Sequence, residues 1–391
     1  MYSEEDINSA VSAGALTPEA AEAFRAHMTL VRQLPRGSEE DFRLINSFND
    51  IFVSIGVVIL LIAVGAIAQA IAGLFAPVES FMDFVNRDPS AEEMAAWRNA
   101  NQAREALQYG LAGLMVAAAA WPLAEFFTRR RRMALPSILL LLAFVGGAFM
   151  AVIGMGAAML GNNDTAVALV ISGAGLFAAL AAWVHWRRFM VPITVAAGTG
   201  AVAATIIGLI LAVVGPDNVD ETVVLGLVFI AGLAVFGFAM RWDISDRERT
   251  TRRSDVAFWL HLLAAPMIAH PVFALLGVTE GDNLGIGAAF AVLAVYVAFG
   301  LLALAVDRRA LLVSALVYVL FALTFLFREF GAVELNFALT ALVIGSALLS
   351  LSAFWQPIRR AVVAALPADW QDKLPATEAP TLAPPAAEPA T

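Results

Sequence analysis

The chain contains no cysteine, only one lysine and only four histidines among its 391 residues. Without cysteine it has no disulfide, no thiolate-bound metal, no iron–sulfur cluster and no cysteine nucleophile. Charged residues make up 15% of the chain, against about 25% in an ordinary soluble domain. The net charge is −9, and every basic segment has a membrane explanation. We therefore expect no nucleic acid partner.

Motifs that carry common enzyme chemistry are also missing. The sequence contains no HExxH zinc motif, no phosphate-binding P-loop and no GxSxG nucleophile elbow. Four histidines leave little material for a metal site. We therefore name no catalytic residue, no metal site and no cofactor, and the sequence argues against an enzyme.

Long apolar runs are what the chain does contain. Hydrophobic residues make up 60% of it and the mean hydropathy is +0.79. An α-helix needs about 20 apolar residues to cross the hydrocarbon core, and its backbone groups must be satisfied within the segment. These runs predict an all-α fold, a polytopic transmembrane bundle in contact with the lipid bilayer. We expect about ten spans, at 51–75, 108–127, 137–160, 165–186, 190–214, 222–241, 256–277, 284–306, 310–327 and 333–355.

The connections between these spans alternate in charge. Five are basic, and the connections between them are acidic or neutral. Tryptophans gather near the basic connections, as in the aromatic belt at a membrane interface. The positive-inside rule then places both termini in the cytoplasm, for a multi-pass protein of the bacterial inner membrane. The five basic segments are 129–132, 187–188, 241–253, 308–309 and 359–360.

Three regions flank or interrupt the spans. Residues 1–49 have the pattern of a cytoplasmic helical hairpin followed by an amphipathic lead-in. Within the membrane domain, 50–356, the long external loop 76–107 contains a helix that Ser90 and Glu93 cap, and this helix could lie on the membrane surface. Residues 357–391, rich in proline and alanine, are expected to be a largely disordered cytoplasmic tail.

The segment WLHLLAAPMIAHPVFALLG, within span 7, combines polar and helix-breaking residues inside an apolar run. Pro266 and Pro271 each remove a backbone donor, which predicts a broken helix like those at the binding sites of many transporters. His270 lies near the midplane, where it could carry a proton or contact a substrate. Alternatively it is a neutral packing residue. His261 lies nine residues earlier, about 13.5 Å away and on the opposite helix face, so the two cannot share one metal ion.

Two further clusters carry charge. Glu329, Glu334 and Asn336 contribute to an acidic outer rim that could attract cations. Alternatively, they are polar only because a tight turn is exposed to water. Arg129, Arg130, Arg131 and Arg132 determine topology and are a candidate site for anionic lipid head groups. Glu125 is expected to pair locally with Arg129.

The segment VSAGALTPEAAEAF, Val11–Phe24, precedes these spans. It resembles the xGxL[ST]PExA segment of an uncharacterised family of bacterial polytopic membrane proteins with a short N-terminal cytoplasmic helical segment. The resemblance implies a similar layout but no catalytic residue. From the residues themselves we expect a transporter-like protein that handles a small solute, an ion or a lipid. The alternative is a non-catalytic scaffold, sensor or assembly factor that binds a cytoplasmic partner through residues 1–37.

Overall fold

The computed structural model describes residues 4–33, 48–160, 164–215, 218–249, 251–278, 285–330 and 334–377. In these ranges the chain is helical and contains no strand. Ten helical segments are long and apolar enough to cross a membrane, which confirms the predicted number of candidate spans. They are α3 (Phe48–Phe75), α5 (Ala91–Ala124) with the π-helical turn η1 (Glu125–Arg130), α6 (Ala134–Leu160), α7 (Asp164–Phe189), α8 (Ile193–Val214), α9 (Glu221–Ile244), α10 (Arg252–Leu275), α11 (Ile286–Val306), α12 (Ala310–Glu329) and α13 (Asn336–Ala353).

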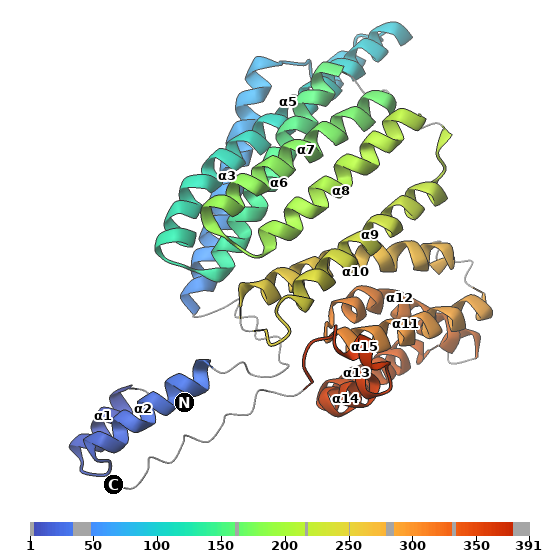
Figure 1. The fold of residues 1–391 in the computed structure, drawn as a ribbon. Helices are drawn as coiled ribbons and strands as arrows, with labels where there is room; N and C mark the ends of the chain where they lie inside the picture. Colours follow the sequence, from blue (N-terminus) through green and yellow to red (C-terminus); the bar gives the residue numbers. More distant parts are fainter. Residues whose placement is uncertain are drawn as a thin grey trace.

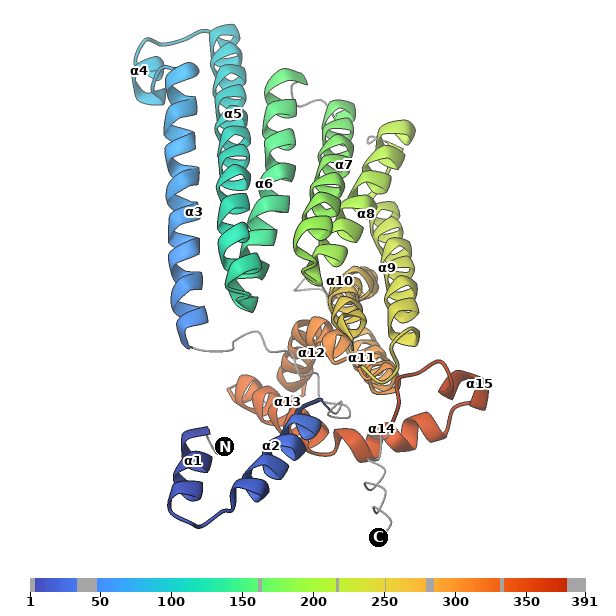
Figure 2. The ribbon, with the colours of Figure 1, turned by 60° about the vertical axis from the view of Figure 1, so that its left-hand side comes forward.

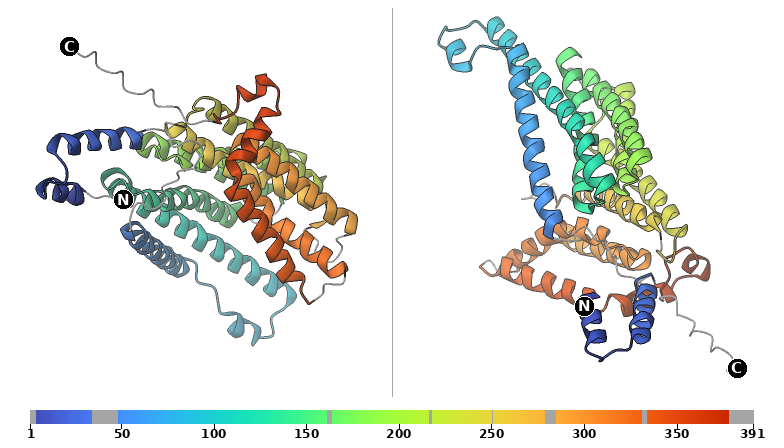
Figure 3. Two further views of the ribbon diagram at one scale, coloured as in Figure 1. Left: turned by 90° about the horizontal axis from the view of Figure 1, so that it is seen from below. Right: turned by 90° about the vertical axis from the view of Figure 1, so that its left-hand side faces the viewer.

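The long candidate spans fall into two groups by direction. Helices α3 and α5–α8 lie side by side in a row, and α11–α13 run at a steep angle to them (Figures 1 and 2). The view on the right of Figure 3 shows the same division. Helix α10 packs against α8, α9 and α12, so it joins the two groups. It is also the most buried of the ten candidates, with 56% of its apolar window buried.

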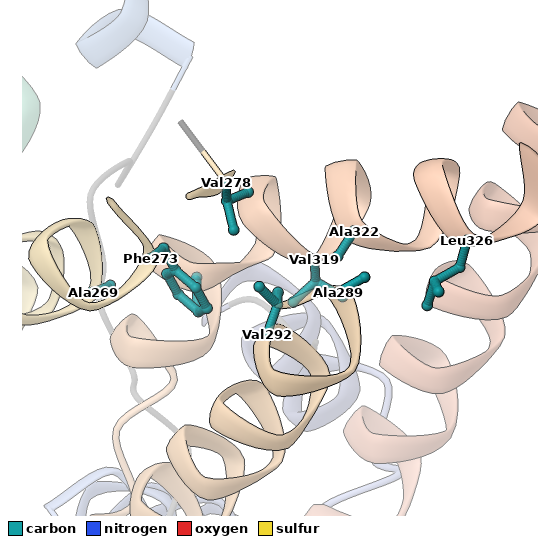
Figure 4. Close-up of a cluster of buried hydrophobic side chains, with 9 residues drawn as sticks. Ala269, Phe273, Val278, Ala289, Val292, Val319, Ala322 and Leu326 are labelled. Carbon is teal, nitrogen blue, oxygen red and sulfur yellow. The ribbon is translucent and has the colours of Figure 1, made fainter. Parts of the chain in front are cut away.

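The core is apolar on both sides of α10. Ala269 and Phe273 of α10 pack against α11 and α12 in one buried cluster, together with Val292 and Val319 (Figure 4). On the other face of α10, Leu260 and Ala264 pack against Val235 of α9. In a membrane, van der Waals packing of these side chains holds α10 against its neighbours.

Helices α5 and α6 pack through glycine. A Cβ atom built on Gly154 would lie 2.3 Å from the backbone nitrogen of Gly110, and one on Gly113 would lie 2.7 Å from the carbonyl oxygen of Gly147. The backbones therefore approach more closely than any larger residue allows.

The helix in the external loop differs from the expectation. The capping box of Ser90 and Glu93 is present, but the helix that it starts continues into the second span as the single helix α5. The short helix α4 (Phe81–Val85) precedes it. No glycine or proline interrupts the chain between Ala91 and Leu107, so nothing in the sequence separates a surface helix from the span.

Helix α10 also differs from the expectation, because it is not broken. It runs without interruption from Arg252 to Leu275 with Pro266 and Pro271 inside it. A proline removes only one helical hydrogen bond, and neighbouring helices can hold a membrane helix in shape around it.

The chain after the last span is more ordered than its composition predicts. The tail expected from residue 357 contains most of α14 (Trp355–Ala364) and all of α15 (Ala368–Gln371). Residues 378–391 lie outside the described ranges. At the other end, α1 (Glu4–Ser12) and α2 (Pro18–Gln33) form the predicted hairpin, in which Arg25 donates to Asn8. The predicted amphipathic lead-in falls mostly on residues 34–47, which are also outside these ranges.

Candidate functional site

The arginine-rich connections lie together at one end of the molecule, which we call the basic end. Arg188, after α7, pairs with Glu125 of η1, and Arg308, between α11 and α12, pairs with Asp243 of α9. Arg359 of α14 lies 3.5 Å from Asp307. Connections far apart in the sequence are thus brought together, as their alternating charge predicts.

A pocket of about 580 Å³ opens at the basic end. Its walls come from η1, the start of α6, the turn between α7 and α8, and the first turns of α10. The walls from η1 to α8 belong to one helix group, whereas the α10 wall belongs to the helix that joins the two groups. We call this cavity the basic pocket. A volume of this size is typical of sites for small molecules.

Four arginines line the basic pocket: Arg129, Arg132, Arg188 and Arg252. Among the described residues that line the pocket, Asp255 is the one carboxylate, and Glu125 pairs with Arg188. The Arg188 Nη2 to Glu125 Oε2 distance is 3.0 Å, whereas Arg129 is 3.4 Å from the same carboxylate. The predicted local pair of Glu125 and Arg129 is thus present, but Arg188 is the closer partner. Four guanidinium groups and two carboxylates leave an excess of two positive charges.

Three helices begin at the basic pocket. Ala134 starts α6, Pro192 directly precedes α8 and Arg252 starts α10, and all three residues line the cavity. The N-terminus of a helix carries a partial positive charge that favours an anion. Helices η1 and α7 end beside the same cavity, at Arg130 and Phe189, and the partial negative charge of their C-termini offsets part of this effect. The excess of arginine is therefore the main source of positive charge.

A buried ionic network lies behind the α10 wall. Asp243 of α9 accepts from Arg308 Nη2 at 2.6 Å, and its second oxygen lies 2.8 Å from His261 Nε2 of α10. All three residues are at most 3% exposed. A buried charge is tolerated only when a partner compensates it, so each of the three depends on the others.

The network continues through Asp307, which is 3% exposed. Its carboxylate accepts from Arg249 at 2.9 Å and from the indole nitrogen of Trp355 at 2.7 Å. Burial lowers the pKa of the Arg359 guanidinium from its ordinary value, and the nearby Asp307 carboxylate opposes this shift. An arginine remains charged through such a change.

The same end binds the chain beyond α15. Arg359 donates to the carbonyl oxygens of Pro375 and Ala376, at 2.7 and 3.1 Å. Arg247 donates to that of Leu374 at 2.9 Å. These bonds are the physical reason that residues up to 377 are ordered, although their composition resembles that of a tail.

The network also supports the wall of the basic pocket. Arg308 Nη2 donates to the carbonyl oxygen of Ser254 at 3.1 Å, between the pocket residues Arg252 and Asp255. Asp246 accepts from both the backbone nitrogen and the hydroxyl of Thr251, which caps α10. The ionic contacts therefore fix the position of the first turn of α10.

The two histidines of α10 face different helices. His261 is buried against α9, where it contacts Asp243. His270 is exposed on the helix surface, and its Nδ1 lies 2.8 Å from the hydroxyl of Tyr318 on α12. Beside it, Pro271 is buried and Pro266 is exposed. Neither histidine lines the basic pocket.

The predicted outer rim is placed only in part. Glu329 and Glu334 are exposed, and Asn336, the first residue of α13, accepts from the backbone nitrogen of Phe337 at 2.6 Å. Residues 331–333 between them are outside the described ranges. In the ranges that are described, no group of three or more histidine, aspartate or glutamate side chains is arranged to hold a metal ion.

Sequence reasoning did not single out Asp243, Arg252, Asp255 or Arg308. Asp243 and Arg252 belong to a connection whose basic character explained them as topology determinants. Asp243 could have been noticed, because a carboxylate within a basic connection at the membrane suggests an ion pair with a nearby arginine. The partner of each residue depends on packing between helices, and the sequence does not show it.

Comparison with known proteins adds no assignment. No protein-family model matches the chain, and no curated protein and no solved structure matches it at a significant level. The resemblance of Val11–Phe24 to a segment of an uncharacterised family therefore stays a prediction from that motif.

Proposed function

We propose that this protein is a transporter-like protein of the bacterial inner membrane that handles an anionic solute or lipid. The observation that carries this proposal is the basic pocket, where four arginines and three helix N-termini converge. The positive-inside rule places the basic end, and with it both termini, in the cytoplasm. The pocket then opens toward the cytoplasm.

The position of the pocket also supports transport. One wall belongs to α10 and the others to the row of α5–α8, so a relative movement of the two helix groups would reshape the cavity. Rigid-body movement of one helix group against another is the common basis of alternating access. The steep angle between the two groups in Figures 1 and 2 fits such a division.

A flux measurement in proteoliposomes tests this function. We expect the full-length protein to move a fluorescent anionic lipid or a small organic anion across the bilayer, and the double variant R132Q/R252Q to reduce the rate at least about tenfold. The variant R130Q/R131Q is the matched control, because it removes the same charge from residues that do not line the pocket. Equal flux with and without protein would overturn the proposal.

The site around His270 gives a second version of the same function. In that version His270→Ala abolishes flux, while R132Q/R252Q leaves it unchanged. The hydrogen bond to Tyr318 allows His270 to exchange a proton with another polar group. Flux that is unaffected by His270→Ala would exclude this version and leave the basic pocket as the site.

A non-catalytic scaffold, sensor or assembly factor is the alternative function. The α1–α2 hairpin favours it, since α1 and α2 pack on each other and leave Leu16 and Phe24 exposed. Under this alternative the proteoliposomes show no flux, and a partner bound to the intact protein is lost when residues 1–37 are deleted.

A further inference from the structure

We infer that the basic pocket binds the phosphomonoester head group of a membrane lipid. This inference rests on the proposed function and names the class of its ligand. It depends on three properties of the pocket: its excess charge, the chemistry of its walls and its place at the ends of the candidate spans.

The charge of the pocket matches a dianion. Among its four arginines, Arg188 is bound by Glu125, and Asp255 lies beside Arg252 near the start of α10. Counted together, the four guanidinium groups and the carboxylates of Glu125 and Asp255 leave an excess of two positive charges. The remaining two positive charges equal the charge of a phosphomonoester, which is about −1.5 to −2 at neutral pH. A phosphodiester head group carries one negative charge and would leave one arginine uncompensated.

Arginine suits a terminal phosphate for a geometric reason. Its guanidinium presents donors in a planar fork that binds two phosphate oxygens at once. A phosphomonoester exposes three such oxygens, so it can engage more than one arginine. The N-termini of α6, α8 and α10 add partial positive charge at the same cavity, and the C-termini of η1 and α7 cancel part of it.

The walls show that the ligand also has an apolar part. Ile138, Phe189 and Val191 line the same cavity as the arginines, and Trp259 adds an amphipathic ring. A volume of about 580 Å³ exceeds what a lone phosphate fills. The arginine-rich walls also lie at the ends of candidate spans, where lipid head groups meet the protein. A head group with the first part of its chains fits these walls better than a soluble anion does.

Native mass spectrometry of the full-length protein in detergent tests this ligand class. The probes are short-chain phosphatidate, phosphatidylglycerol with the same chains, and inorganic phosphate. We expect phosphatidate to bind at least about tenfold more tightly than either other probe. R132Q/R252Q should weaken phosphatidate binding at least about tenfold, whereas R130Q/R131Q should change it less than about twofold.

Each remaining outcome of this experiment overturns the inference. Equal binding of phosphatidylglycerol contradicts the charge match, and equal binding of inorganic phosphate identifies a soluble anion instead of a lipid. An equal loss in the two double variants shows a general effect of charge. If R132Q/R252Q does not fold, the variant D255N serves as the test. Removal of the Asp255 carboxylate from the pocket wall should tighten phosphatidate binding, and weaker or unchanged binding contradicts the inference.

The binding experiment and the flux experiment test the ligand class and the transport function separately. Selective phosphatidate binding without flux in proteoliposomes would retain the ligand class and reject the transport function. Flux of anionic lipid that does not distinguish the two head groups would retain transport and reject the phosphomonoester ligand.

Discussion

At the residue scale, the meaning of a polar side chain in a membrane protein depends on its partner. His261 and His270 both interrupt apolar sequence, but His261 joins a buried ionic network and His270 contacts a tyrosine on the helix surface. The sequence drew attention to His270 through its depth in the span. The sequence could not show the importance of His261, because its partner Asp243 lies on another helix and Arg308 is 47 positions further along the chain.

The Asp243–Arg308 pair gives a prediction at this scale. Asp243→Asn should destabilise the protein by about 3–5 kcal/mol, because it removes the buried negative charge that both Arg308 and His261 contact. Denaturant unfolding in detergent, followed by tryptophan fluorescence, measures this change. The control is Glu79→Gln, which removes the acid of the exposed Arg87–Glu79 pair and should have little effect. Equal losses in the two variants would show that the buried network adds no stability.

At the element scale, the spans were predictable from the sequence, but the continuity of individual helices was not. Ten apolar runs predicted ten helices because length and hydropathy are local properties of each segment. The continuity of α10 through Pro266 and Pro271 depends on neighbouring helices, so local rules for proline predicted a break that is absent. The same limit applies to α14 and α15, whose order depends on contacts of Arg247 and Arg359 with distant carbonyl oxygens.

The packing of α5 on α6 gives a prediction for the elements. Gly154→Ala should destabilise the protein by at least about 1–3 kcal/mol, because the added Cβ would lie 2.4 Å from the carbonyl oxygen of Ala106 and the backbone must move apart. Gly146→Ala is the matched control on the same helix, since nothing lies within 4 Å of a Cβ atom there. Thermal unfolding of the two variants in the same detergent measures the difference. Equal melting temperatures would show that close backbone approach at Gly154 does not hold the pair together.

At the scale of the whole molecule, the sequence predicts the number of candidate spans, and the fold shows that α10 joins two groups of them. The hydropathy pattern gives ten candidate spans but no packing order, and the division into two groups at a steep angle is visible only in the fold (Figures 1 and 3). The clustering of basic connections was predictable from their alternation. The basic pocket was not, because Arg252 joins Arg129 and Arg132 only when α10 packs beside α8.

The absence of cysteine makes the orientation of the whole molecule directly measurable. Single cysteines introduced into this chain are the only thiols that it has. If the positive-inside rule applies, Arg131→Cys at the basic end faces the cytoplasm and Glu92→Cys at the start of α5 faces outward. Both positions are exposed, so neither thiol is shielded by packing.

In right-side-out membrane vesicles, a membrane-impermeant maleimide should therefore label Glu92→Cys at once and Arg131→Cys only after detergent is added. The parent chain is the blank, because it has no thiol to react. Labelling in the reverse order would place the basic pocket on the outside, and a ligand from the cytoplasmic leaflet could not reach it. Labelling of both cysteines before detergent would put Glu92 and Arg131 on the same side of the membrane, so the single span of α5 and η1 between them would not cross it.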